Sequence, residues 1–216
     1  MRVQIPNLLA GQNQLLFPRR VRLDYYWAKR AIDIVVVILG APAALLVIGA
    51  CCLAIFLKMG RPVFFVQDRT GLGGRVFKMY KLRTMNPRSS SGGEATSKDD
   101  PRVTPLGRFL RRSHFDELPQ LWNILKGEMT LIGPRPEQPQ LVAAYRSSLS
   151  DYDLRHTVVP GLTGCAQVYY GYASDLRETQ AKLSYDLYYV HNIGPALDFQ
   201  IALRTFRVYS DPHYVR

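Results

Sequence analysis

An uncharged, apolar run from Ile34 to Leu57 is the feature that most limits how this chain can fold. As a helix rising about 1.5 Å per residue, it would measure about 36 Å, enough to cross a bilayer core of about 30 Å. The run begins too late and is too long for a cleavable signal peptide, and it lacks a small-residue cleavage site. The sequence therefore predicts a membrane helix, and the other elements must fold around it.

Basic residues flank this run on both sides, and such flanks favour the cytoplasmic face of a membrane. A spanning helix would leave one of the two flanks on the opposite face. Pro42, with Gly40 and Gly49, also interrupts the run, and a proline inside a helix removes a hydrogen bond and kinks the axis. We therefore expect a re-entrant helix that enters and leaves on one face, with a spanning helix as the alternative. The basic flanks are Arg19, Arg20, Arg22, Lys29 and Arg30 before the run, and Lys58, Arg61, Arg69 and Arg75 after it.

Three regions are expected: an N-terminal tail or interface segment (1–28), the re-entrant membrane helix (29–60) and a cytoplasmic catalytic domain (61–216). In the third region, Val63–Gln67 and Val76–Leu82 read as strands joined by a glycine-rich turn, which predicts a β-hairpin. These glycines do not open a helix after a strand, so they match a nucleotide-binding fingerprint poorly.

Later segments complete a predicted α+β fold. Asn86–Pro101 is a polar, low-complexity loop, and Gly164–Val168 reads as a short strand after a loop. Asp175–Val190 and Leu197–Val208 have the apolar spacing of amphipathic helices, and the second suits either the core or a membrane surface. We expect an N-terminal re-entrant membrane helix and a small mixed domain with a β-hairpin, a central catalytic helix and amphipathic interfacial helices.

The chain is strongly basic, with a formal net charge of +11 and a pI of about 9.8. This charge predicts an anionic partner: nucleic acid, a membrane surface or a phosphorylated substrate. No recognition helix, zinc finger or aromatic-basic RNA-binding motif is recognisable, so nucleic acid is not expected. The three cysteines match no metal-ligand spacing and are typical of reducing, cytosolic surroundings.

Two adjacent carboxylates, Asp116 and Glu117, lie among arginines in the stretch Arg111–Glu137. Apolar residues then recur at i, i+3, i+4 and i+7, which predicts a helix that Asp116 caps and that Gly127 ends. A helix N-terminus would favour an ionised Asp116, as a carboxylate nucleophile requires. Acids ringed by arginines suggest phosphate chemistry; a capped surface helix with solvated charges is the alternative. The nearby arginines are Arg108, Arg111, Arg112 and Arg135.

Several segments in order resemble the small monotopic phosphoglycosyl transferases, a bacterial sugar transferase family, and especially its exopolysaccharide-initiating members. They are KRAID, the apolar run, FFVQDRTG, FKMYKLRTM, LGRFLRRSHFDELPQLWNILKGEMTLIGPRPE, VPGLTGCAQV and KLSYDLYYVHN. The resemblance implies transfer of a phosphosugar from a UDP-sugar to undecaprenyl phosphate through an aspartyl-phosphosugar intermediate. It also implies Mg²⁺ and a re-entrant helix at the cytoplasmic face of a bacterial inner membrane.

Residue by residue, the resemblance makes Asp116 the nucleophile and Glu117 a Mg²⁺ ligand, with Asp116 beside the same metal. Arg111 and Arg135 would bind substrate phosphate. Two further residues that the family needs for activity match Lys81 and Asp186. The family usually breaks its membrane helix at a Ser-Pro pair about one turn later than Ala41-Pro42, so the position of the kink differs here.

Two other functions remain open on the sequence alone. A membrane-bound glycosyltransferase would move only the sugar and release UDP, whereas a phosphoglycosyl transferase releases UMP. A non-catalytic membrane adaptor with a basic face would bind membranes without turnover. The apolar surface can serve lipid or a partner, which leaves a homo-oligomer open.

Overall fold

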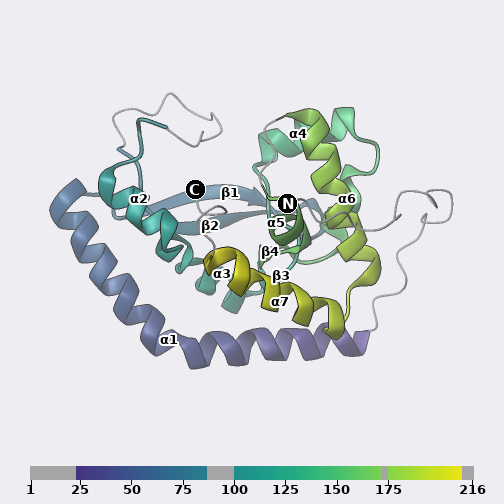
Figure 1. Ribbon diagram of the computed structural model, residues 1–216, viewed down its shortest axis with the longest axis horizontal. Coiled ribbons are helices and arrows are strands. Elements are labelled where there is room, and N and C mark those ends of the chain that lie inside the picture. Colours follow the sequence, from purple (N-terminus) through teal and green to yellow (C-terminus); the bar gives the residue numbers. More distant parts are fainter. Residues whose placement is uncertain (1–22, 87–99, 172–174, 211–216) are drawn as a thin grey trace.

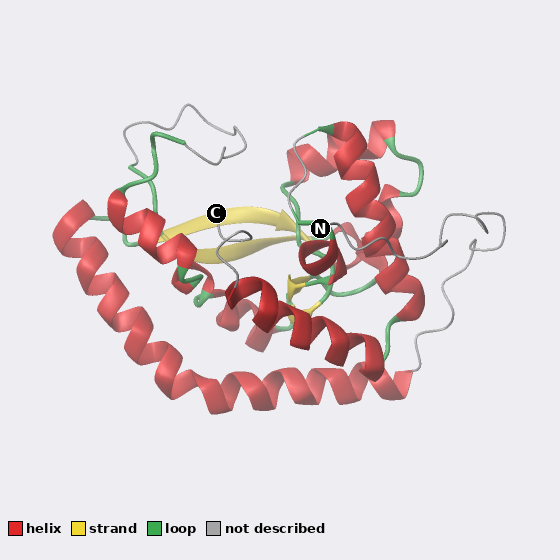
Figure 2. Cartoon of the chain, viewed as in Figure 1, coloured by secondary structure: helices red, strands yellow, loops and turns green. Residues whose placement is uncertain are grey.

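The computed structural model describes residues 23–86, 100–171 and 175–210, and it has the expected mixed α+β architecture with one long apolar helix (Figures 1 and 2). That helix, α1 (Leu23–Met59), precedes the hairpin of β1 (Phe64–Thr70) and β2 (Val76–Leu82). The elements that follow are α2 (Pro105–Arg112), η3 (Phe115–Glu117), α3 (Gln120–Lys126), β3 (Thr130–Ile132), α4 (Pro139–Ser148), η4 (Tyr152–Thr157), β4 (Gly161–Thr163), α5 (Cys165–Tyr169), α6 (Leu176–Asn192) and α7 (Pro195–Ser210); η1 (Leu72–Gly74) lies in the hairpin turn.

The hairpin pairs β1 with β2 in antiparallel register, and a side chain from α3 completes its other edge. The Asn123 amide nitrogen donates to the carbonyl of Lys78 at 2.7 Å, and its amide oxygen accepts from the N–H of Tyr80 at 3.2 Å. The amide thus replaces a neighbouring strand for these two backbone groups. A second, parallel pair joins β3 to β4.

Replacing the fully buried Asn123 with alanine should lower the free energy of unfolding by about 2–4 kcal/mol, because the Tyr80 N–H and the Lys78 carbonyl would lose the side chain that pairs with them. Thermal denaturation would measure the change. Lys126→Ala is the matched control on the same helix: its ion pair with Glu128 is exposed to solvent and should contribute much less to stability. Equal effects of the two substitutions would contradict this role for Asn123.

Helix α1 runs along the whole domain and bends between its two halves (Figure 1). Pro42 lies inside it and cannot donate to the preceding turn, which accounts for a bend in mid-helix. Both ends are attached to the same domain. Near the N-terminal end the Lys29 ammonium contacts the Asp198 carboxylate of α7 at 2.6 Å. At the C-terminal end Arg83, just after β2, donates to the carbonyls of Met59 and Gly60.

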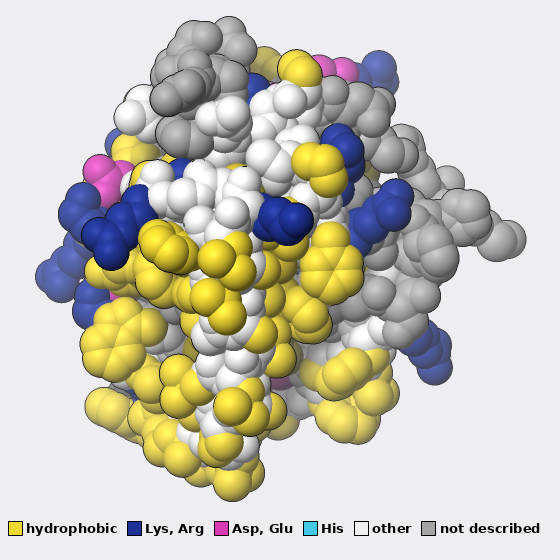
Figure 3. Space-filling model, turned by 90° about the vertical axis from the view of Figure 1, so that its left-hand side faces the viewer, with side chains coloured by type: hydrophobic (Ala, Val, Ile, Leu, Met, Phe, Trp, Pro, Cys, Tyr) yellow, Lys and Arg dark blue, Asp and Glu magenta, His cyan; other side chains and the backbone are white. Residues whose placement is uncertain are grey.

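Much of α1 exposes apolar side chains, while Lys29, Arg30 and Asp33 contact the domain. Within the described part of the chain, α1 is the single helix long and apolar enough to cross a membrane. Asp33 is buried and accepts hydrogen bonds from Thr130 and Leu131 of β3. Figure 3 shows apolar side chains gathered over the lower part of one face, with lysines and arginines above them. The exposed apolar residues of α1 include Trp27, Ile32, Ile38, Leu39, Leu45, Leu46, Leu53, Phe56 and Leu57.

The structure corrects two local predictions. Gly164–Val168 is not a strand: the short strand β4 ends at Thr163, and α5 begins at Cys165. Asp116 does not cap the central helix either. His114 adopts the left-handed conformation (φ 56°), so Asp116 lies in a separate 3₁₀ turn, and α3 begins only after Pro119. The predicted hairpin and the helix end at Gly127 (φ 82°) are confirmed. Most of the expected loop Asn86–Pro101 lies outside the described residues.

Candidate active site

Two positively charged side chains from separate elements meet at Glu117. Its Oε1 atom accepts from the Lys81 ammonium of β2 at 2.6 Å and from the Arg135 guanidinium, in the loop after β3, also at 2.6 Å. Burial raises the pKa of Glu117, but the two cations outweigh this effect and hold that pKa well below its usual value. Burial in turn lowers the pKa of Lys81, and the charge of Glu117 opposes that change. The structure therefore brings together three residues that lie far apart in the sequence.

The neighbouring carboxylate, Asp116, is in a different electrostatic position. Burial raises its pKa to about 6, although the charges of Lys81, Arg111 and Arg135 oppose the rise; Glu117 adds to it. The sequence-based expectation that a helix N-terminus favours the ionised form is therefore wrong, because α3 begins four residues later and burial dominates. Asp116 is a buried carboxylate held close to three cations and one anion.

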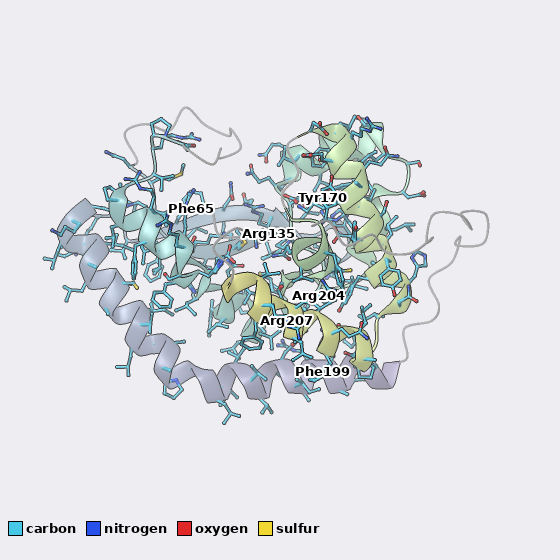
Figure 4. The ribbon with its side chains drawn as sticks, viewed as in Figure 1. Phe65, Arg135, Tyr170, Phe199, Arg204 and Arg207 are labelled. Atoms are coloured by element: carbon cyan, nitrogen blue, oxygen red, sulfur yellow. The ribbon has the colours of Figure 1, made fainter. Side chains whose placement is uncertain are left out.

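Arg111, at the end of α2, is also part of this cluster. Its Nε atom donates to the Thr84 hydroxyl at 3.0 Å, which fixes the guanidinium beside the end of β2. Burial lowers the pKa of Arg111, and the Asp116 charge raises it, so the two groups lie within electrostatic range. The predicted phosphate-binding residues Arg111 and Arg135 thus approach the carboxylate pair from different elements, and Figure 4 places Arg135 near the middle of the molecule.

The backbone around Arg135 is held by two arginines that sequence reasoning did not select. Arg155 donates to the Arg135 carbonyl at 2.7 Å, and Arg69 donates to the next carbonyl, that of Pro136, at 2.9 Å. Together with the fixed backbone of the flanking prolines, these bonds orient the Arg135 peptide. Arg69 belongs to the FFVQDRTG segment, where the sequence indicates only a basic flank of the membrane helix, and Arg155 lies in η4, outside the segments that carry the resemblance.

Asp186 is connected to the carboxylate pair through Arg155 and Arg135. It is only 2% exposed, on α6, and its Oδ2 atom accepts from Arg155 at 2.7 and 3.1 Å. Burial raises the pKa of Asp186, while Arg155 lowers it. The Asp186 side chain contacts Arg155, which in turn donates to the Arg135 carbonyl, so this aspartate does not lie on a solvated face of α6.

The donor set suits a Mg²⁺ ion shared with substrate. Mg²⁺ in phosphate-handling sites takes one or two protein carboxylates and fills its other positions with water and phosphate oxygens. Asp116 and Glu117 offer such carboxylates, and the Glu117 Oε2 atom takes part in no hydrogen bond among the described residues. Those residues contain no cluster of three or more His, Cys, Asp or Glu side chains for a closed metal site. Mg²⁺ at this pair stays a prediction.

Fold and site together define an α+β domain that carries a cation-lined carboxylate pair beside a long apolar helix. Comparison with known proteins gives the family. The model of the family described as "Bacterial sugar transferase" matches residues 24–211, nearly all of the chain. The chain therefore belongs to the bacterial sugar transferase family.

Three relatives illustrate this membership. The UDP-N-acetylgalactosamine-undecaprenyl-phosphate N-acetylgalactosaminephosphotransferase of Aeromonas hydrophila is 40% identical over 95% of this chain and 48% of its own length. The UDP-glucose:undecaprenyl-phosphate glucose-1-phosphate transferase of Escherichia coli (strain K12) is 37% identical over 91% of this chain and 40% of its own. A putative undecaprenyl-phosphate N-acetylgalactosaminyl 1-phosphate transferase of Bacillus subtilis (strain 168) is 42% identical over 61% of this chain and 74% of its own. The chain thus spans about half or less of the length of the first two of these relatives.

Proposed function

We propose that this protein is a membrane-associated phosphoglycosyl transferase that moves a phosphosugar from a UDP-sugar to undecaprenyl phosphate, as the first membrane step of glycoconjugate or exopolysaccharide synthesis. The observation that carries the proposal is the buried Asp116 beside the Lys81–Glu117–Arg135 cluster. The names of the relatives supply the donor and acceptor classes. A buried carboxylate surrounded by fixed cations suits attack on phosphorus, which depends mainly on positioning and charge stabilisation.

The proposed reaction has two steps. A carboxylate oxygen of Asp116 attacks the phosphorus that bears the sugar, the bond from that phosphorus to the bridging oxygen breaks, and UMP leaves. An oxygen of the acceptor phosphate then attacks the same phosphorus, and the Asp116 carboxylate leaves, giving a polyprenyl diphosphosugar. Arg111 and Arg135 orient and neutralise phosphate oxygens, and Lys81 holds Glu117 in its ionised form. When bound, Mg²⁺ would add positive charge at the diphosphate, held by Glu117 with Asp116 beside it.

The nucleotide product and the state of the protein test this function together. Incubating the protein with a UDP-sugar and Mg²⁺, without lipid, should release UMP and increase the protein mass by one phosphosugar. Release of UDP would instead identify a glycosyltransferase that moves only the sugar. Membrane binding with no nucleotide release from any of a panel of UDP-sugars would support the adaptor reading and contradict the proposal.

The proposed membrane arrangement is monotopic, with α1 re-entrant and the domain on the cytoplasmic face of a bacterial inner membrane. The support is the attachment of both ends of α1 to one domain, through Lys29–Asp198 and through Arg83. At about 1.5 Å per residue, its 37 residues extend about 55 Å, yet both ends contact the domain because the helix lies along it and bends. A spanning helix would carry one of these ends across the bilayer, away from its partner.

Labelling of single cysteines tests this arrangement. Cysteines introduced at Tyr26 and at Lys58, one near each end of α1, should both react with a membrane-impermeant thiol reagent in inside-out vesicles and neither in right-side-out vesicles. The background for this test would replace the native cysteines Cys51, Cys52 and Cys165 with alanine. Reaction of the two positions from opposite sides would establish a spanning helix.

A further inference from the structure

Helix α2 presents an aromatic side chain outward right next to the candidate site. Its inner side is fixed: Leu110 is buried, and Gly107 lies so close to Thr84 that a Cβ atom there would come within 2.0 Å of the Thr84 carbonyl oxygen. With that side against the domain, Phe109 is left 58% exposed. An exposed phenylalanine in a tightly anchored helix is available for an apolar partner.

Phe109 is joined by aromatic contact to the residue before the proposed nucleophile. The ring of Phe115 stands edge-on to that of Phe109, with their centroids 6.2 Å apart. Phe115 in turn packs against a cluster that contains Cys51 and Ile55 of α1. Apolar contact is therefore continuous from α1 to the residue directly next to Asp116.

Basic residues lie beside this apolar surface, as an amphiphilic anion would require. Arg108 and Arg112, four residues apart and both exposed, lie together on one side of α2, next to Phe109. The same end of α1 exposes Phe56 and Leu57. Figure 3, which faces the end of the molecule that carries α2 and the C-terminal half of α1, shows apolar side chains bordered by basic ones.

We propose that Phe109, with Phe115 behind it, is the contact surface for the first isoprene units of the lipid acceptor. This inference rests on the proposed function. The acceptor phosphate must reach the phosphorus held on Asp116, so its hydrocarbon chain has to leave the site past neighbouring residues. Phe115 and Phe109 provide the apolar surface that begins next to Asp116 and joins α1, where the chain would enter lipid. A hydrocarbon chain that packs on these rings would remove apolar surface from water.

Separating the two half-reactions tests this assignment. In Phe109→Ala the release of UMP without lipid should equal that of the unchanged protein, because the proposal places the acceptor, and not the donor, on this surface. Transfer to a long-chain polyprenyl phosphate should fall about tenfold in kcat/KM, the order expected when one aromatic ring is lost from an apolar contact. Transfer to a phosphate with only two isoprene units should fall as much, whereas a merely membrane-seating role would spare this short, soluble acceptor.

Phe206→Ala is the matched control, since Phe206 is a similarly exposed phenylalanine on α7. It should weaken vesicle binding without changing kcat/KM for the short acceptor in detergent. If Phe109→Ala and Phe206→Ala behave alike, the assignment is overturned and Phe109 only seats the protein in lipid.

A measurement of lipid binding, rather than of turnover, tests this assignment independently of the proposed function. Photo-crosslinking of a diazirine-bearing polyprenyl phosphate should label Phe109 or Phe115 in the unchanged protein, irrespective of turnover. Labelling confined to other surfaces, or to a second protein copy seated on α2, would overturn the assignment while leaving the UMP-release result intact.

Discussion

Asp116→Asn should lower the rate of UMP release at least about a thousandfold. The same substitution should make the protein more stable. An amide cannot serve as the carboxylate nucleophile, so the covalent step is lost. Burial raises the pKa of Asp116 to about 6 from an unfolded value of about 3.9, so its ionisation opposes folding at neutral pH. The gain from removing this charge should be on the order of 2 kcal/mol, or a few degrees in Tm.

The pH dependence of this gain follows from the sign of the shift. A raised folded-state pKa contributes stability that is fully present below about pH 4 and lost as the pH rises through about 6. The difference in Tm between Asp116→Asn and the unchanged protein should therefore be large at pH 7.5 and shrink toward zero near pH 4. Melting curves recorded with a chelator, so that no divalent ion binds the carboxylates, would measure it.

Glu117→Gln is the matched control, because the pKa of Glu117 is shifted in the opposite direction to that of Asp116. The pKa of Glu117 is held well below its usual value by Arg135 and Lys81, so its ionised form stabilises the fold. Glutamine would remove the buried negative charge that Lys81 and Arg135 both contact and should cost about 3 kcal/mol or more. Activity falls in both variants, but Tm should move in opposite directions. A fall in Tm for both would contradict the assignment of Asp116 as the destabilising, reactive carboxylate.

Sequence patterns were sufficient for the elements that local residues determine. The uncharged run, the hairpin and the helix end at Gly127 depend on hydrophobicity, turn glycines and a left-handed C-cap, all of which are visible in short windows. The position of Asp116 was not predictable in this way. Its turn depends on His114 in a conformation that non-glycine residues rarely adopt, and the sequence gives no sign of it.

Contacts across long sequence separations account for the rest of the site. That Lys81 and Arg135 meet on one oxygen of Glu117 depends on how β2, η3 and the loop after β3 pack. The two arginines that hold the Arg135 backbone went unassigned because backbone carbonyls leave no trace in a sequence. The family resemblance indicated Asp186, but its burial could not be predicted from the spacing of apolar residues, because burial in a tyrosine-rich helix depends on the elements packed around it.

The Arg155–Asp186 pair should show that stability and activity can be separated at this site. Asp186→Asn leaves the fully buried Arg155 without its counter-charge and should lower the free energy of unfolding by about 3–5 kcal/mol. Asp153→Asn, which weakens the exposed contacts of Asp153 with Arg146 and His156, is the matched control and should cost much less. Thermal or urea denaturation would measure both.

The double variant Arg155→Met/Asp186→Leu decides what the pair does, because replacing a whole buried ion pair with apolar side chains is often neutral for stability. Its Tm should recover most of what Asp186→Asn loses. UMP release should nevertheless stay about 10–100-fold low, with the loss mainly in KM for the UDP-sugar, because the Arg135 carbonyl no longer has the Arg155 donor that orients its peptide. If activity returns together with Tm, the pair is only structural; if it does not, Asp186 acts on the reaction through Arg155 and the Arg135 backbone.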